Sequence, residues 1–186
     1  MSALLCQANT SQLLIIDIQE KLAGAMPAGV LANVLHSNQI LISACKALAI
    51  PVLHSEQYPK GLGHTHAELQ SALADQTPAF EKTCFSSCAA SGMDTLLNNT
   101  TRNQIVLTGM EAHICVLQTV MQLLAQGKQV FVVEDGVCSR EETHFRNALA
   151  RMRQAGAIIT NRESVLFEWL GDASHPQFRE LSKLIR

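Results

Sequence analysis

Residues 104–135 read QIVLTGMEAHICVLQTVMQLLAQGKQVFVVED, and this stretch decides the fold class. Two short apolar runs, 104–110 and 129–135, flank residues 112–126, whose apolar positions recur at helical spacing. Continuous apolar strands are typical of a parallel sheet that is buried on both faces. Gly127 is placed where a glycine commonly ends a helix. The stretch therefore predicts a strand, a helix and a second strand parallel to the first.

The same alternation extends over the rest of the chain. Further strands are expected at 13–19, 50–57 and 157–160, with a weaker candidate at 79–85, and helices at 30–48, 141–155 and within 175–186. Alternating strands and helices predict a doubly wound α/β fold, in which a parallel sheet has helices on both faces and ligands bind beyond the carboxyl ends of the strands. With no repeat or linker, residues 1–186 are expected to form a single domain.

Composition argues against several classes of partner. The formal net charge is −2 and there is no run of Lys or Arg, so neither nucleic acid nor an anionic membrane is expected as a partner. The first ten residues lack the basic and apolar regions of a signal peptide, and no apolar run approaches the roughly 20 residues of a membrane span. We therefore expect a cytoplasmic protein whose six cysteines are reduced thiols.

Two charged residues lie at or near expected strand ends. Asp17 follows the apolar run LLII, and taken alone it is best explained as a cap for the next loop or helix. Lys82 shares a strand face with Phe80 and Cys84, so its ammonium must either reach water or meet an anion. An Asp17–Lys82 pair would satisfy both groups.

Cys115 lies in the first turns of the helix that follows the strand 104–110. The positive end of the helix dipole, and a nearby lysine, would lower the pKa of this thiol from about 8.5 toward neutrality. The alternative is that Cys115 simply packs, as most unpaired cysteines do. That alternative is preferred for the other cysteines, which lack such a setting: Cys6, Cys45, Cys84, Cys88 and Cys138. For Cys115 the combination of strand end, helix start and charged pair favours a nucleophile.

The segments LLIIDIQ (13–19), EKTCFS (81–86) and TGMEAHICVLQT (108–119) resemble the Asp, Lys and Cys segments of the isochorismatase-like cysteine hydrolases. HSEQYPKGLG (54–63), ARMRQAGA (150–157) and GDASHPQFRELSKLI (171–185) are similar to the isochorismatase domain-containing proteins within that superfamily. The resemblance implies a Rossmann-like, three-layer αβα fold with a six-stranded parallel sheet. It also implies a catalytic triad that needs no cofactor.

In that triad Cys115 would be the nucleophile. Asp17 would accept the thiol proton and later deliver a proton to the leaving group, and Lys82 would hold Asp17 and stabilise charge. The resemblance further implies a cis peptide bond at Met110–Glu111. The backbone N–H groups of Glu111 and Cys115 would then form an oxyanion hole.

Two departures from the superfamily limit the reaction. The nicotinamidase branch has an Asp-x-His metal motif where this chain has Glu56 and Tyr58, and His64 and His66 alone read as polar loop residues, so no metal is expected. Isochorismatases that hydrolyse a vinyl ether use no cysteine nucleophile. Cys115 therefore favours hydrolysis of an amide or related C–N bond through a thioester.

The remaining expectations concern the pocket and the partners. Gln19, Glu56, Gln57 and Tyr58 lie at strand ends and are candidate substrate contacts, while His113 is expected at the pocket rim or an interface. The substrate is expected to be a small molecule, and the chain a homo-oligomer, as is common in the superfamily. Three alternatives stay open: a non-catalytic scaffold, a vinyl-ether hydrolase, and a redox sensor in which Cys84 pairs with Cys115.

Overall fold

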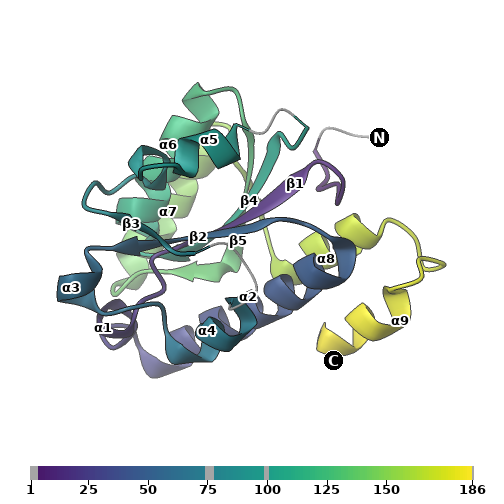
Figure 1. The fold of residues 1–186 in the computed structure, drawn as a ribbon, viewed down its shortest axis with the longest axis horizontal. Coiled ribbons are helices and arrows are strands. Elements are labelled where there is room, and N and C mark those ends of the chain that lie inside the picture. Colours follow the sequence, from purple (N-terminus) through teal and green to yellow (C-terminus); the bar gives the residue numbers. More distant parts are fainter. Residues whose placement is uncertain (1–3, 74–77, 99–100, 186) are drawn as a thin grey trace.

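A six-stranded parallel sheet forms the centre of the protein (Figure 1). The computed structural model describes residues 4–73, 78–98 and 101–185. The order across the sheet is β3-β2-β1-β4-β5-β6. The strands are β1 (Ser11–Ile16), β2 (Val52–Gln57), β3 (Phe80–Lys82), β4 (Gln104–Met110), β5 (Gln129–Cys138) and β6 (Ile158–Thr160). The α/β class and the parallel sheet predicted from the sequence are confirmed.

Helices cover both faces of the sheet. They are α1 (Glu20–Ala23), α2 (Ala28–Leu48), α3 (Pro59–Leu62), α4 (Ala67–Leu73), α5 (Met93–Leu97), α6 (Leu117–Ala125), α7 (Glu142–Gln154), α8 (Arg162–Leu170) and α9 (Phe178–Leu181). Tighter or wider turns are the 3₁₀ segments η1 (Ser87–Ala89) and η3 (Ser182–Ile185) and the π-helix η2 (Ala112–Val116). None of the helices in the described ranges is long and apolar enough to cross a membrane.

Alternate residues of each strand enter two separate cores, as the period of a strand requires. On one face, Leu13 and Ile15 of β1 pack in a cluster with apolar residues of α2, α4, α8 and α9. On the other, Leu14 and Ile16 pack in a cluster with residues of α5, η2, α6 and α7. Figure 1 shows these helices as layers on either side of the sheet. Because both faces are covered, all six residues of β1 are buried.

Several boundaries differ from the expected ones. Strand β5 continues to Cys138, because its pairing with β4 shifts register between Leu107 and Gly109. Helix α8 was not expected. Its start is fixed by Asn161, whose side-chain oxygen accepts a hydrogen bond from the Ser164 N–H at 2.9 Å. The expected C-terminal helix is two short segments, α9 and η3, and Arg186 lies outside the described residues.

The strand order reverses between β1 and β4, which is where open α/β sheets bind their ligands. Gly109 lets these two strands meet there. A Cβ at Gly109, whose φ is +127°, would lie 2.1 Å from the Ile16 carbonyl oxygen and 2.6 Å from the Ile16 nitrogen. Gly109 does not mark a turn. In the structure it is still paired within β4, and close approach to β1 is what requires glycine.

Candidate active site

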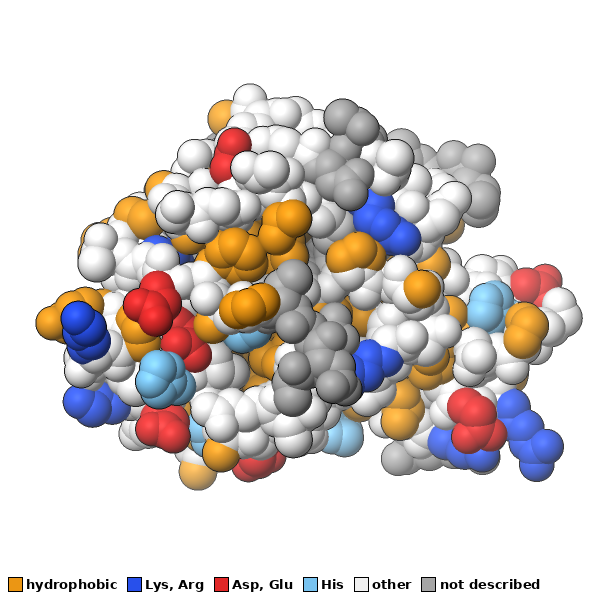
Figure 2. Space-filling view, viewed as in Figure 1, with side chains coloured by type: hydrophobic (Ala, Val, Ile, Leu, Met, Phe, Trp, Pro, Cys, Tyr) orange, Lys and Arg blue, Asp and Glu red, His pale blue; other side chains and the backbone are white. Residues whose placement is uncertain are grey.

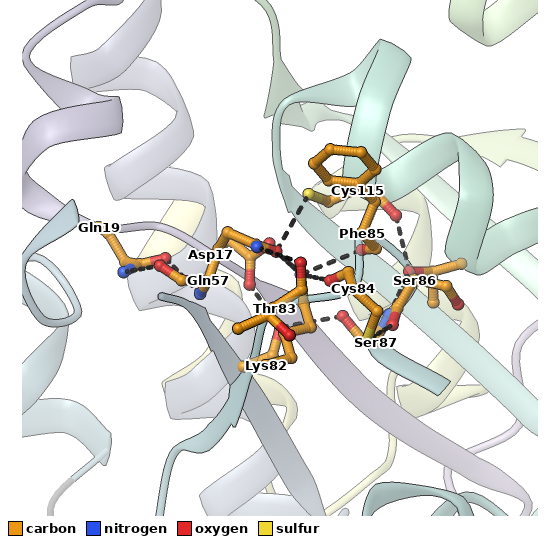
Figure 3. A network of polar contacts seen from close by, with 12 residues as sticks. Asp17, Gln19, Gln57, Lys82, Thr83, Cys84, Phe85, Ser86, Ser87 and Cys115 are labelled. Atoms are coloured by element: carbon orange, nitrogen blue, oxygen red, sulfur yellow. Dashed lines mark hydrogen bonds and ion pairs between the residues drawn. The ribbon is translucent and has the colours of Figure 1, made fainter. Parts of the chain in front are cut away.

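Asp17 and Lys82 form a buried ion pair beyond the carboxyl end of the sheet (Figure 3). Lys82 Nζ lies 2.7 Å from Asp17 Oδ2, and both side chains are fully buried. Asp17 directly follows β1 with a φ of +51°, and Lys82 is the last residue of the edge strand β3. Neither charge reaches water, so each is held in the interior by the other and by hydrogen bonds.

The Lys82 ammonium is surrounded by further acceptors. It donates to Gln57 Oε1 at 2.7 Å, and to the carbonyl oxygens of Cys84 and Phe85 at 3.3 and 3.0 Å. Three protons cannot satisfy four acceptors with equal geometry, and the two 2.7 Å contacts identify Asp17 and Gln57 as its main partners. The pair is therefore embedded in a polar network that joins β1, β2 and the loop after β3.

Cys115 faces this network from the other side of the switch point. It is the fourth residue of the π-helix η2, its exposed fraction is 5%, and its Sγ lies 4.0 Å from Gln57 Oε1. Its carbonyl oxygen accepts a hydrogen bond of 2.7 Å from Thr119 Oγ1. Figure 3 shows the sulfur on the same side of the sheet edge as the Asp17 and Lys82 side chains.

The expectation of a lowered thiol pKa is wrong. Burial, followed by the Asp17 carboxylate, raises the pKa of Cys115 to about 12, and Lys82 opposes this only in part. The lysine is neutralised by Asp17, so the thiol lies beside an ion pair with no net charge. The residue also lies within a π-helix rather than in the first turn of α6, so the dipole argument assumed the wrong local structure. The resting sulfur is therefore protonated and needs a proton acceptor.

Glu111 is the residue that joins β4 to η2. The Met110–Glu111 peptide bond is cis. The Glu111 side chain is 5% exposed and accepts hydrogen bonds from the Arg140 backbone N–H at 2.9 Å and from Arg140 Nε at 3.1 Å. These contacts tie the loop to the end of β5.

The expected substrate contacts are not all gathered at the thiol. Gln19 is fully buried, where its amide donates to the Gln57 and Gly63 carbonyl oxygens and accepts from the Gln57 N–H. Glu56 accepts hydrogen bonds from the Thr65 backbone N–H and hydroxyl, both at 2.7 Å. Gln57 alone of this set has an atom recorded beside the sulfur.

Tyr58 has a different environment. It is 53% exposed with a φ of +38°, and its ring lies where a Cβ on Gly61 would be. His64 Nδ1 lies 3.0 Å from Glu56 Oε2, and this carboxylate raises the pKa of the exposed imidazole. Among the described residues, no group of three His, Cys, Asp or Glu side chains could hold a metal ion. His113 Nδ1 lies 2.9 Å from Ser139 Oγ.

Sequence reasoning missed three hydroxyl residues beneath the pair. Ser55 Oγ lies 2.7 Å from Asp17 Oδ1 and 3.0 Å from Ser87 Oγ, and the Ser87 N–H donates to Thr119 Oγ1 at 2.9 Å. All three residues are at most 1% exposed. Serine and threonine at strand ends and in helices are too common to single out, and only the folded arrangement relates them to the carboxylate.

A family model described as the isochorismatase domain matches residues 11–164. The chain belongs to the isochorismatase family. Isochorismatase family protein 1B of Dictyostelium discoideum is 38% identical over 176 residues, covering 93% of this chain and 84% of the relative. Isochorismatase domain-containing protein 2 of Danio rerio is 38% identical over 175 residues, covering 94% and 86%.

Two solved structures share the fold. A structure described as the MAR1 ribonuclease from Caenorhabditis elegans is 41% identical with a TM-score of 0.90, covering 97% of this chain and 92% of its own. The YcaC protein of Escherichia coli, described as an octameric hydrolase of unknown specificity, is 20% identical with a TM-score of 0.84, covering 98% and 97%. At 20% identity the YcaC structure shows the fold alone, and it is membership of the isochorismatase family that supports a hydrolase role.

Proposed function

We propose that this protein is a cofactor-independent hydrolase of a small molecule, which uses Cys115, Asp17 and Lys82 to cleave an amide or related C–N bond through a thioester. The observation that carries the proposal is the buried 2.7 Å ion pair beside a nearly buried thiol at the switch point of the sheet. A fold gains nothing obvious from such a group, because buried ion pairs contribute weakly to stability. The raised pKa of Cys115 beside this ion pair favours a catalytic role.

In the proposed first step, Cys115 Sγ attacks the substrate carbonyl carbon while its proton moves to the Asp17 carboxylate. The thiol pKa of about 12 makes this transfer necessary, because almost no thiolate exists beforehand. Lys82 keeps the carboxylate in place, and Gln57 keeps Lys82 in place. The C–N bond then breaks, and Asp17 returns the proton to the leaving nitrogen.

In the second step, water attacks the thioester carbon, its proton passes to Asp17, and the C–S bond breaks. Asp17 then returns that proton to the sulfur, so the enzyme ends as it began. The negative oxygen that forms in each step would be met by the N–H groups of Glu111 and Cys115. Arg140 supports this by holding the Glu111 side chain.

Turnover of a panel of amides, ureas and vinyl ethers tests the proposal. Cys115→Ala should abolish release of product from any substrate found, because the thioester can no longer form. Cys84→Ala is the matched control, since within the described ranges the Cys84 sulfur makes one hydrogen bond, to the Ser86 carbonyl oxygen at 3.4 Å, and its loss should leave turnover unchanged. Undiminished turnover by Cys115→Ala would refute a cysteine mechanism, and turnover of vinyl ethers alone would favour the vinyl-ether alternative.

A ribonuclease is the second candidate, because the 41% identical structure from C. elegans is described as one. The charge of this chain opposes it. The formal net charge is −2, and in Figure 2 basic side chains are scattered among acidic ones instead of forming a continuous field. Incubation with single-stranded RNA, with Cys115→Ala as the blank, distinguishes the two. Cleavage that needs Cys115 would extend the substrate class to RNA, and no turnover of any compound would favour a scaffold.

Assembly and compartment are also proposals. We infer a homo-oligomer, because the E. coli YcaC structure is described as octameric. Size-exclusion chromatography with light scattering would measure it. All six cysteines are free thiols in the structure, which agrees with the reducing cytoplasm.

A further inference from the structure

We propose that Ser55 is a positioning residue for the proton acceptor, and that Ser55 and Ser87 form a one-way chain of hydroxyl donors that keeps Asp17 ionised and aligned with the nucleophile. This rests on the proposed function, because it gives Asp17 the role of proton acceptor. It adds a device that the triad itself does not contain. The two hydroxyls are buried. Ser55 lies in β2 and Ser87 in η1, and the carboxylate that they serve directly follows β1.

The two oxygens of Asp17 have different partners. Oδ2 accepts from Lys82 Nζ at 2.7 Å, and Oδ1 accepts from Ser55 Oγ at 2.7 Å. The two residues are also joined through their backbones, since the Asp17 N–H donates to the Ser55 carbonyl oxygen at 3.1 Å. The titratable groups that face the carboxylate are Lys82 from β3 and Cys115 from η2, whereas β2 and η1 contribute uncharged hydroxyls. Without Ser55, Oδ1 would lose its recorded donor.

The direction of the chain follows from proton counting. An ionised carboxylate can only accept, so the single hydroxyl proton of Ser55 must point to Asp17. The contact of 3.0 Å between the two serine hydroxyls, in which either could be the donor, must then be Ser87 donating to Ser55. Donors in series polarise one another, so Ser87 strengthens the bond that Ser55 makes to Asp17.

The far end of the chain connects to the nucleophile. The Ser87 N–H donates to Thr119 Oγ1 at 2.9 Å, and Thr119 Oγ1 donates to the Cys115 carbonyl oxygen at 2.7 Å. A series of hydrogen bonds that passes through the backbone of Ser87 thus connects Asp17, the proton acceptor, with Cys115, which supplies the proton. Figure 3 shows Ser87 next to the loop that also binds the Lys82 ammonium. The separation of Asp17 and Cys115 is set by this framework before any substrate enters.

A purely structural role for the serines predicts a different result from a positioning role. Loss of any buried hydroxyl lowers stability, but only loss of a hydroxyl in the series that ends on Oδ1 changes the proton affinity of Asp17. Ser55→Ala removes a bond that the ionised form makes and the protonated form does not need. The titration midpoint of the carboxylate should therefore rise by about one pH unit, a tenfold gain in proton affinity.

The test is a pH titration of the Asp17 carboxyl carbon by ¹³C NMR on the full chain, with the signal assigned by its loss in Asp17→Asn. Ser55→Ala should raise the midpoint by about one unit, Ser87→Ala should raise it less, and Ser55→Thr, which keeps the hydroxyl, should restore it. The matched control is Ser11→Ala. Ser11 is a fully buried serine at the opposite end of β1 from Asp17. There its hydroxyl forms hydrogen bonds with Gln104 and Trp169.

An unchanged midpoint in Ser55→Ala, or an equal rise in Ser11→Ala, would overturn the proposal. If Ser55→Ala does not fold, Ser87→Ala tests the proposal by itself. An unchanged midpoint of Asp17 in Ser87→Ala would contradict the series of donors from Ser87 through Ser55 to Asp17. The measurement needs no substrate. A failure of the hydroxyl chain is thus distinguishable from a failure of the cysteine mechanism, which is judged by turnover of Cys115→Ala.

Discussion

Replacing Lys82 by Met should destabilise the fold far more than the loss of an ordinary lysine. The variant leaves the Asp17 carboxylate fully buried without its ammonium partner, and it takes a donor from Gln57 Oε1. Removing one partner of a buried ion pair costs about 3–5 kcal/mol, since the other charge stays buried and uncompensated. That is a large part of the roughly 5–15 kcal/mol by which a domain is stable.

Equilibrium unfolding in urea at pH 7 measures this loss. Lys128→Met is the control, because Lys128 is also buried, with 9% exposed, and makes no recorded ion pair among the described residues. We expect less than about 1 kcal/mol for the control. The double variant Asp17→Asn/Lys82→Met should be more stable than Lys82→Met, because no charge is then stranded. The deficit of Lys82→Met should also shrink as the pH falls, since protonation removes the stranded charge.

The reasoning is refuted if Lys82→Met is no less stable than Lys128→Met, or if the double variant is less stable than Lys82→Met. Either result would mean that the carboxylate is satisfied without its ammonium. The pair would then not be the element that holds the acceptor in place.

Three further predictions follow from the thiols and from Gly109. Because the pKa of the Cys115 thiol is about 12, this residue should react slowly with iodoacetamide at pH 7, and the rate of alkylation should rise about tenfold for each pH unit above that. Peptide mass spectrometry measures the rate, and a rate that stops rising below pH 8 would contradict a protonated thiol. Burial raises the pKa of Cys138 to about 12, whereas the pKa of the same thiol in the unfolded chain is about 8.5. The contribution of the protonated thiol to the free energy of unfolding is therefore complete below about pH 8.5 and is lost as the pH rises toward 12. The free energy of unfolding should fall above pH 9, and Cys138→Ala should lessen the slope by about 1.4 kcal/mol per pH unit; an unchanged slope would argue against burial as the cause. Gly109→Ala should lower the free energy of unfolding by at least about 4 kcal/mol or prevent folding, because the new Cβ would lie 2.1 Å from the Ile16 carbonyl oxygen. A Cβ at Gly29 would have nothing within 4 Å, so Gly29→Ala should melt at nearly the same temperature as the unchanged protein.

The sheet could be predicted because its strands are locally distinct. Apolar runs such as 104–110 are buried on both faces, and glycines such as Gly127, with a φ of +78°, end the helices between them. Helix α8 was missed because its signal is a single polar cap, Asn161, ahead of a mixed segment. The extension of β5 to Cys138 depends on a register shift against β4, and such a shift cannot be predicted from the sequence of one strand alone.

The Asp17–Lys82 pair could be predicted from the sequence, and the protonation of Cys115 could not. Asp17 and Lys82 stood out because a charge at a buried strand end demands a partner, and the structure supplies one at 2.7 Å. The protonation of Cys115 could not be read from its position, because desolvation depends on packing from both sides of the sheet. The same limit hid the positions of Gln19 and Glu56. The Gln19 amide bonds Gln57 and Gly63, and the Glu56 carboxylate bonds Thr65 and His64, instead of the sulfur.

The most direct measurement of the central claim is peptide mass spectrometry on protein quenched in acid during turnover of an amide substrate. The proposed mechanism predicts that the peptide containing Cys115 gains the mass of the acyl group, and that the adduct disappears in Cys115→Ala together with turnover. An adduct on another residue, or rapid turnover in Cys115→Ala, would contradict it.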